Sequence, residues 1–235
     1  MNGETALVTG ANTGIGREIA AQLAAEGMTV YLGARDADRG KAAAGELGGD
    51  VRFVQLDVAE QAQVDAAAKR IADERGSLDV LVNNAGIGGS RPEVEATTAA
   101  DFGAVLDVNL LGAVRTTHAL LPLLREADLP RIVNVSSGRG SFAITEDPER
   151  MESKLLGLVY PVSKTALNML TLQYARALPE FRVVAVDPGF TATALNNHTG
   201  TRSAGESART IVRLALASFD GPSGRLYDAD GLVGW

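Results

Sequence analysis

The sequence predicts an α/β protein built on one doubly wound parallel sheet of about seven strands, with helices on both faces. Short runs rich in β-branched residues alternate with longer, alanine-rich amphipathic stretches along nearly all of the 235 residues, which is typical of βαβ units. The candidate strands are apolar runs rather than strict alternations of apolar and polar residues, as expected of strands that are buried on both faces. A glycine-rich turn joins the first strand to the first helix.

The predicted elements follow one another in a regular order. Because no stretch rich in proline, glycine and serine divides the chain, we expect a single domain over residues 1–235. An inserted segment at about 138–158 is too long for a simple connection, and such a segment is usually functional or partly helical. Strands are expected at residues 5–9, 29–33, 51–56, 80–82, 131–135, 182–186 and 224–227, and helices at 15–26, 37–47, 61–74, 99–124, 160–178 and 204–217.

Composition narrows the class of protein. The chain is 46% hydrophobic, which is enough for a sizeable core. Its net charge of −7 argues against a nucleic-acid or anionic-membrane partner, since both require basic surfaces. The absence of cysteine excludes disulfides and thiolate metal sites, and no set of His, Asp and Glu has metal-ligand spacing, so no metal is expected. No secretory signal precedes the first strand and no apolar run reaches the length of a membrane span, so we expect a cytoplasmic location.

The glycine-rich turn predicts a binding site for a phosphate-bearing ligand. Glycine permits close approach of the backbone, and the start of the following helix offers unpaired N–H groups. In this strand–turn–helix context the ligand we expect is a dinucleotide, and the alternative is an ordinary connection. The turn lacks the Lys-Ser/Thr ending of a P-loop, so hydrolysis of a nucleoside triphosphate is not indicated. The residues expected to contact the dinucleotide are Gly10, Asn12, Thr13, Gly14, Ile15 and Gly16.

The end of the second predicted strand bears on which dinucleotide is bound. An acidic residue there favours the ribose hydroxyls of NAD, whereas an arginine favours the 2′-phosphate of NADP. The sequence has Arg35, with Arg39 one helical turn further along, so NADP(H) is favoured over NAD(H). Asp36 keeps NAD open as an alternative, unless this side chain only caps the next helix.

Tyr160 and Lys164 are a candidate catalytic pair. On a helix, residues four positions apart share one face, and a neighbouring ammonium lowers the pKa of a phenol from its usual value of about 10. The pair would then supply a proton donor that works near neutral pH. The same spacing also arises by chance on half-exposed helices, so the catalytic interpretation depends on the rest of the chain.

Taken in order, the motifs resemble those of the classical short-chain dehydrogenase/reductase family. Each motif is modest alone, but their sequence along nearly the whole chain is specific. The matching residues are Thr9-Gly10-x-x-x-Gly14-x-Gly16, Asp57-Val58, Asn83-Asn84-Ala85-Gly86, Asn109, Ser136-Ser137, Tyr160-x-x-x-Lys164 and Pro188-Gly189-Phe190-Thr191-Ala192-Thr193.

The resemblance implies a Rossmann-type fold and a role for each motif. Tyr160 would donate a proton to the developing alkoxide, and Lys164 would lower the pKa of that phenol and bind the nicotinamide ribose. Ser137, rather than Ser136, would bind the substrate oxygen. Asn109 would hold a water that links Lys164 to solvent, or would cap a local kink of its helix. Further cofactor contacts are implied for Asp57, Val58, Asn83, Ala85, Gly86, Pro188, Gly189, Phe190, Thr191 and Thr193.

Within the family, the chain resembles the NADPH-dependent carbonyl reductase branch. Tyr160 lies 23 positions after Ser137, a longer gap than in most members. Members with long gaps are often monomers because the inserted segment covers a surface that tetramers use, so we expect a monomer, with a homodimer as the alternative. Many NADPH-preferring members carry a basic residue where Thr13 stands, which leaves the 2′-phosphate more dependent on Arg35.

The substrate pocket is expected between the insertion, the loop after Gly86 and a lid at about 190–203. His198 of the lid is a weak candidate for substrate contact, and His118 is expected to be a packing or surface residue. The acidic run at 146–152 is expected to be a solvated helix face. Apolar walls are expected from Phe142, Leu156, Phe190 and Leu195, which suits an apolar ketone, aldehyde or quinone.

The sequence therefore predicts an NADP(H)-dependent oxidoreductase that reduces the carbonyl group of a small molecule. An alternative is an NAD-linked alcohol dehydrogenase that works in the oxidative direction. A second alternative is a dinucleotide-binding regulator without turnover, although such a protein would have no need of the complete set of Asn109, Ser137, Tyr160 and Lys164.

Overall fold

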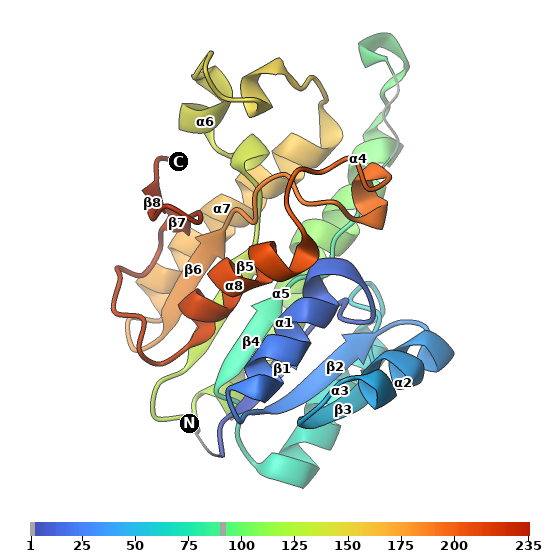
Figure 1. The fold of residues 1–235 in the computed structure, drawn as a ribbon, viewed down its shortest axis with the longest axis vertical. Coiled ribbons are helices and arrows are strands. Elements are labelled where there is room, and N and C mark those ends of the chain that lie inside the picture. Colours follow the sequence, from blue (N-terminus) through green and yellow to red (C-terminus); the bar gives the residue numbers. More distant parts are fainter. Residues whose placement is uncertain (1–2, 90–92) are drawn as a thin grey trace.

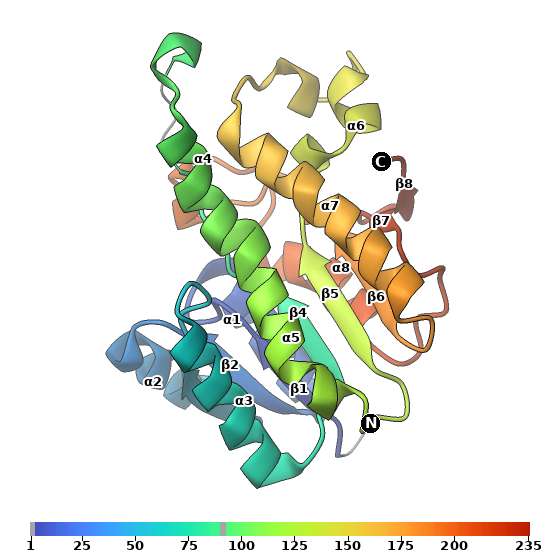
Figure 2. The ribbon, with the colours of Figure 1, turned by 180° about the vertical axis from the view of Figure 1, so that it is seen from behind.

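The protein is described by a computed structural model that covers residues 3–89 and 93–235. Met1, Asn2 and residues 90–92, which belong to the loop expected to line the substrate pocket, lie outside the described residues. The described chain forms a single eight-stranded sheet with helices on both faces (Figures 1 and 2), so the predicted fold class is confirmed. None of the helices in these two ranges combines the length and the apolar character needed to cross a bilayer.

The sheet has the strand order β3-β2-β1-β4-β5-β6-β7-β8. The chain order reverses between β1 and β4, and in open parallel sheets ligands bind beyond the carboxyl ends of the strands at such a point. The first seven strands pair in parallel, and β8 is antiparallel to β7. The strands are β1 (Thr5–Val8), β2 (Thr29–Ala34), β3 (Asp50–Gln55), β4 (Val80–Asn83), β5 (Arg131–Val135), β6 (Arg182–Val186), β7 (Leu226–Tyr227) and β8 (Leu232–Val233).

Two layers of helices enclose the sheet. Figure 1 shows one face, covered by α1 (Gly14–Ala25), α2 (Ala37–Glu46) and α8 (Ala204–Ala215). Figure 2 shows the other face, covered by α3 (Gln61–Arg75), α5 (Gly112–Leu124) and α7 (Val159–Ala177). Neighbouring strand residues point to opposite faces, so Val8 packs under α1 while Leu7 packs under α3 and α5. This arrangement explains why the central strands are largely apolar on both faces.

The helix expected at 99–124 is interrupted. It consists of α4 (Ala99–Leu106), a π-helical segment (Asp107–Leu111) and α5. A π-helical turn accommodates an extra residue, and such turns occur often at functional sites. Here it lies around Asn109, which is 2% exposed. A helical hydrophobic pattern does not reveal a single extra residue, so the sequence did not predict this break.

The inserted segment is partly helical. It contains a 3-10 turn (Gly138–Gly140), α6 (Phe142–Glu146) and a second 3-10 turn (Glu152–Lys154). The expected helix face at 146–152 is wrong, because α6 ends at Glu146 and the residues up to 151 form turns and bends. The C-terminus lies beside α6 (Figure 1). Gly234 and Trp235 brace this helix by accepting hydrogen bonds from Ser141 and Ala143.

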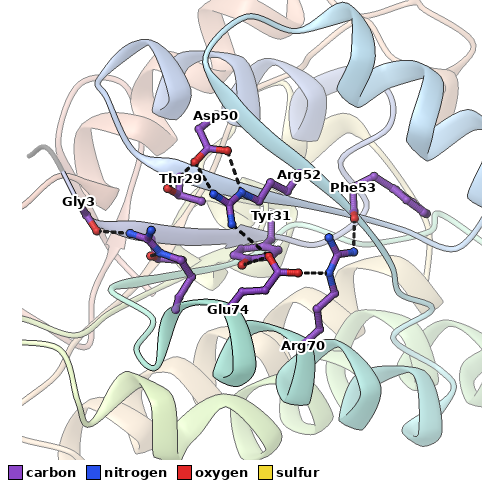
Figure 3. Close-up of polar contacts among 10 residues, drawn as sticks. Gly3, Thr29, Tyr31, Asp50, Arg52, Phe53, Arg70 and Glu74 are labelled. Atoms are coloured by element: carbon purple, nitrogen blue, oxygen red, sulfur yellow. Dashed lines mark hydrogen bonds and ion pairs between the residues drawn. The ribbon is translucent and has the colours of Figure 1, made fainter.

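A polar network ties the edge strand β3 to β2 and α3. Figure 3 shows the carboxylate of Glu74 between Tyr31, Arg52 and Arg70. Tyr31 donates to Glu74 at 2.7 Å, and Arg52 also pairs with Asp50 on its own strand. The network helps to hold β2 and β3 in register. It thereby also helps to position the residues that follow β2.

Candidate active site

The turn between β1 and α1 admits only glycine at its key positions. Gly10 and Gly14 have φ of 62° and 56°, in the left-handed region that favours glycine. A Cβ on Gly10 would lie 2.9 Å from the Cα of Ala85, and one on Gly16 would lie 2.5 Å from the carbonyl oxygen of Gly10. The close approach of the turn to the end of β4 therefore explains the glycine pattern.

The start of α1 suits an anionic ligand. In the described chain, Thr13 at the N-cap makes no capping hydrogen bond with its side chain, and the first turn of α1 contains no acidic residue. The N–H groups of this turn and the positive end of the helix dipole are thus available to a phosphate. Asn12 and Ile15 are half-buried beside them, and Thr13 is exposed.

The end of β4 is fastened to the glycine-rich turn by two residues. The Thr9 hydroxyl accepts hydrogen bonds from the N–H groups of Asn84 and Ala85, both at 3.0 Å. The Asn84 amide donates in turn to the carbonyl oxygens of Thr9 and Gly10. Sequence reasoning gave neither Thr9 nor Asn84 a role of its own, because a bond between two loops leaves no trace in local spacing.

Asn83 faces the protein interior. Its side chain is 5% exposed and bonds to Asn134 on β5 and to Thr116 on α5. The side chain of this expected cofactor residue is therefore bonded inside the protein. Gly86 lies close to the catalytic candidates, since a Cβ at Gly86 would be 3.6 Å from Nζ of Lys164.

The residues expected near the adenosine half lie at the ends of β2 and β3. Arg35 follows β2 and is exposed, while Asp36 is the N-cap of α2 and accepts a hydrogen bond from the N–H of Arg39 at 2.9 Å. Arg39 also forms a loose ion pair with Asp36 at 3.7 Å. Asp57 is half-buried and caps its own loop through Ala59, and Val58 is buried beside it.

Tyr160 and Lys164 lie on the first turns of α7. Nζ of Lys164 is 5.7 Å from the centroid of the Tyr160 ring and donates to the carbonyl oxygen of Val135 at 2.8 Å. Burial lowers the pKa of Lys164 to about 8, because a charged ammonium loses hydration in the interior. The ring of Tyr160 is half-buried. The spacing of these residues thus brings a cation close to a phenol at the carboxyl end of β5.

The two serines after β5 point in different directions. Ser136 is 2% exposed, and its hydroxyl donates to Asn168 of α7 at 2.5 Å. Ser137 is half-buried and accepts a hydrogen bond from the N–H of Arg139 at 3.3 Å. Ser136 is thus bonded inside the protein to α7. Ser137 lies nearer the surface.

Asn109 joins three parts of the site. Its carboxamide accepts from the N–H of Ile87 at 2.8 Å and donates to the carbonyl oxygen of the same residue at 3.0 Å. It also donates to the hydroxyl of Ser163 at 3.0 Å, and Ser163 donates to the carbonyl oxygen of Tyr160 at 2.7 Å. The π-helical segment, the loop after β4 and α7 are therefore bonded through one side chain.

The loop after β6 closes over the glycine-rich turn. Gly189 has φ of 75°, and its N–H donates to Asp187 at 3.0 Å. Thr191 is fastened to Ser207 of α8 at 2.6 Å, and the side chain of Thr193 packs 3.5 Å from where a Cβ of Gly14 would stand. Asp187 is 4% exposed and burial raises its pKa. The sequence analysis did not single out Asp187, which holds the loop through Gly189. Its position directly before Pro188 placed it beside the motif that was identified.

The lid residues and the expected apolar walls are distributed over several places. Asn197 and His198 have φ of 52° and 59°, and His198 is exposed, as is His118 on α5. Leu195 packs near Gly88 of the loop after β4, whereas Leu156 is 94% exposed.

Phe142 lies in a separate groove. This groove of about 530 Å³ separates α6 from the outward face of α7 and is mainly apolar. Val162 and Met169 on that face are 46% and 56% exposed, so the inserted segment leaves it open. The expectation of a monomer assumed that the inserted segment covers a surface used in tetramers. The inserted segment does not cover Val162 and Met169.

The chain is similar to known proteins over nearly its whole length. The family model described as short chain dehydrogenase matches residues 4–204. (+)-Neomenthol dehydrogenase from Arabidopsis thaliana is 37% identical, over 94% of this chain and 95% of that protein. The structure of salutaridine reductase from Papaver somniferum is 33% identical with a TM-score of 0.84, over 95% of this chain and 99% of that one. The NADPH-bound carbonyl reductase from chicken fatty liver is 26% identical with a TM-score of 0.87, over 100% of both chains.

The chain belongs to the short-chain dehydrogenase family and is an oxidoreductase of that type. The predicted family is thereby confirmed. The alignment with the Arabidopsis thaliana relative spans 283 positions, more than the 235 residues of this chain, so that relative carries segments that this chain lacks.

Within residues 3–89 and 93–235, no group of three or more His, Cys, Asp or Glu side chains is arranged to hold a metal ion.

Proposed function

We propose that the protein reduces a carbonyl group to an alcohol with NADPH, and that Tyr160 donates the proton. The observation that carries this proposal is the buried ammonium of Lys164, 5.7 Å from the Tyr160 ring, in a chain whose first helix start is open to a phosphate. Relatives named neomenthol dehydrogenase and salutaridine reductase support the reaction class.

The residues around the glycine-rich turn fit a nicotinamide dinucleotide. The N–H groups from Gly10 to Gly16 would hold the pyrophosphate, Asp57 and Val58 would border the adenine, and residues 188–193 would hold the carboxamide. Lys164 would also bind the nicotinamide ribose. When bound, the cofactor supplies a hydride to the carbonyl carbon.

NADP(H) is favoured over NAD(H) by the surroundings of Arg35. Asp36, the residue that would accept the ribose hydroxyls of NAD, already caps α2 through the N–H of Arg39. The exposed guanidinium of Arg35 is left to pair with a 2′-phosphate, and Arg39 lies within reach as a second cation. Among structural neighbours, the chicken carbonyl reductase is described with NADPH and a reductase from Brucella melitensis with NADH.

Proton transfer to the substrate is proposed to depend on Tyr160 and Lys164 of α7, with help from Ser137 and Asn109. Ser137 donates a hydrogen bond to the substrate oxygen, and Tyr160 transfers its phenolic proton to that oxygen as negative charge develops there. The ammonium of Lys164 stabilises the phenolate that remains. Asn109 holds the backbone of Ile87 and the hydroxyl of Ser163 and, in this proposal, a water through which Lys164 regains protons.

The substrate is proposed to be an apolar ketone, aldehyde or quinone. Leu195 of the lid lies near Gly88 of the loop after β4 and is 44% exposed, and Leu156 of the insertion is 94% exposed. Such side chains favour apolar partners, because burying them against a substrate removes apolar surface from water.

The test is NADPH oxidation by the purified protein with a panel of apolar ketones, aldehydes and quinones, run in parallel with NADH. The wild type is expected to turn over with NADPH, and Tyr160→Phe is expected to lose turnover while NADPH still raises its melting temperature. Equal turnover by Tyr160→Phe would refute the assignment of the proton donor. Binding of NADPH without turnover on any member of the panel would instead favour a dinucleotide-binding regulator.

A further inference from the structure

A second cation, Arg139, lies beside the catalytic candidates. It stands two positions after Ser137, in the 3-10 turn Gly138–Gly140, and is half-buried. Its N–H donates to the hydroxyl of Ser137 at 3.3 Å. The backbone of Arg139 is therefore bonded to the side chain that is proposed to hold the substrate oxygen.

The guanidinium of Arg139 reaches the ring of Tyr160. Its Cζ is 5.9 Å from the ring centroid, a distance close to that of Lys164 Nζ at 5.7 Å. Both distances are within the range of about 6 Å at which a cation is attracted to an aromatic ring. The Tyr160 phenol thus lies near two positive charges that come from different elements.

The inserted segment fixes the guanidinium in this place. Nη2 of Arg139 donates to the carbonyl oxygens of Leu155 and Leu156, at 3.1 and 3.0 Å. The next residue is Gly157, with φ of 152°, and a Cβ there would lie 2.9 Å from the same nitrogen. The backbone just before α7 is therefore folded closely around the arginine, which restricts where its charge can go.

Two carboxylates border the same turn. Oδ2 of Asp187 and Oε1 of Glu152 lie 2.8 and 3.2 Å from the position of a Cβ on Gly138. Glu152 also forms an ion pair with Arg150 at 3.5 Å. These groups belong to the electrostatic surroundings of Tyr160 together with Lys164 and Arg139, so an experiment on the tyrosine has to isolate the contribution of Arg139.

We infer that Arg139 is a positioning residue for the reduction: it stabilises the Tyr160 phenolate with a second positive charge and ties residues 155–157 of the insertion to the active site. The inference rests on the proposed function, in which Tyr160 gives up its proton to the substrate oxygen. A cation is attracted more strongly to the phenolate than to the neutral phenol. Arg139 therefore favours the state of the enzyme that follows proton transfer.

The ionisation of Tyr160 can be measured without substrate or cofactor. The chain has four tyrosines, and burial raises the pKa of Tyr31, Tyr174 and Tyr227. The near-ultraviolet absorbance of phenolate is titrated against pH for each protein and for the same protein carrying Tyr160→Phe. The difference between the two curves isolates Tyr160.

Arg139→Met is expected to move the Tyr160 midpoint upward by about one pH unit, a tenfold change in its ionisation constant. Arg139→Lys keeps the charge and is expected to restore most of the shift. Arg176→Met, at an exposed position in the last turn of α7, controls for the loss of one positive charge and is expected to leave the midpoint unchanged.

A folded Arg139→Met protein with the wild-type midpoint would overturn the inference. If Arg139→Met does not fold by circular dichroism, Arg139→Gln replaces it under the same criterion. In a second readout, kcat/KM at pH 7 is expected to fall in Arg139→Met and to recover in Arg139→Lys, whereas Arg176→Met keeps the wild-type value. If the midpoint shifts but the wild type turns over no carbonyl, the proposed function fails while the link between Arg139 and Tyr160 stands.

Discussion

The ammonium of Lys164 donates a hydrogen bond to the carbonyl oxygen of Val135 at 2.8 Å, although only 4% of the lysine is exposed. This bond joins the last residue of β5 to the second turn of α7. It also holds the charge beside Tyr160 in an environment with little water, where burial lowers the pKa of Lys164 to about 8. The position of the group and its unusual acidity thus have the same cause.

The rate of carbonyl reduction is expected to fall as the pH rises above about 8. The pKa of Lys164 lies below its ordinary value of 10.5, so the ammonium is present at neutral pH and is lost with a midpoint near 8. Without it, the phenolate left by Tyr160 is less stable. The measurement is kcat/KM with saturating NADPH between pH 6 and pH 10, and a flat profile across this range would contradict the expectation.

The sequence predicted the seven parallel strands because most of them are largely apolar runs and each is flanked by turn residues. It did not predict β8, because Leu232 and Val233 join the sheet only by pairing antiparallel with β7, and the local sequence does not reveal that pairing. The candidate site likewise has a part that is visible in the local sequence and a part that is not. Motifs read along the chain include Tyr160 and Lys164, but contacts between distant segments, such as Arg139 with Leu155, depend on the folded insertion.

Replacement of Arg35 by Ala is expected to weaken NADPH far more than NADH. The exposed guanidinium follows β2, and a bidentate pair with the 2′-phosphate has no counterpart in NADH. A loss of about tenfold to a hundredfold in the affinity for NADPH corresponds to about 1.4–2.8 kcal/mol. Both affinities are measured by titrating protein fluorescence.

One control variant tests whether the effect of Arg35→Ala comes from that position. Lys41→Ala removes a positive charge from an exposed position of α2 and is expected to leave the preference between the two cofactors unchanged. Equal losses for NADPH and NADH in Arg35→Ala would remove the phosphate role from this residue.

Glu74→Gln is expected to lower stability at neutral pH and to flatten its dependence on acid. Hydrogen bonds from Arg70, Tyr31 and Arg52 hold the pKa of Glu74 at about 2, below its ordinary value of 4.5 (Figure 3). A group with a lowered pKa contributes its full stability above the unfolded value, and this contribution is lost as the pH falls from 4.5 through 2.

The measurement for Glu74 is the free energy of unfolding by urea at several pH values. Glu46→Gln removes a carboxylate from an exposed ion pair with Arg17 and controls for the change in net charge. If the wild type and Glu74→Gln lose stability in parallel between pH 4.5 and pH 2, the network does not hold this carboxylate in its charged form.

Asn109→Leu is expected to cost both stability and turnover. The substitution keeps the approximate size of the side chain but leaves the N–H and the carbonyl oxygen of Ile87 without their partner, in a place where Asn109 is 2% exposed. A buried group left unpaired costs roughly 1–3 kcal/mol, so the free energy of unfolding should fall by about 2–4 kcal/mol. His118→Ala, at an exposed position on the continuation of the same helix, is expected to leave it nearly unchanged.

The loss of turnover in Asn109→Leu follows from the chain of bonds that leads to the catalytic helix. Asn109 donates to Ser163, and Ser163 donates to the backbone carbonyl of Tyr160. When the first bond is lost, the π-helical segment no longer holds the start of α7, and kcat should fall by more than the change in KM. A variant that unfolds more easily but keeps the wild-type kcat would show that Asn109 supports the fold alone. Thermal melts with and without NADPH, together with steady-state kinetics well below the melting temperature, separate these two outcomes.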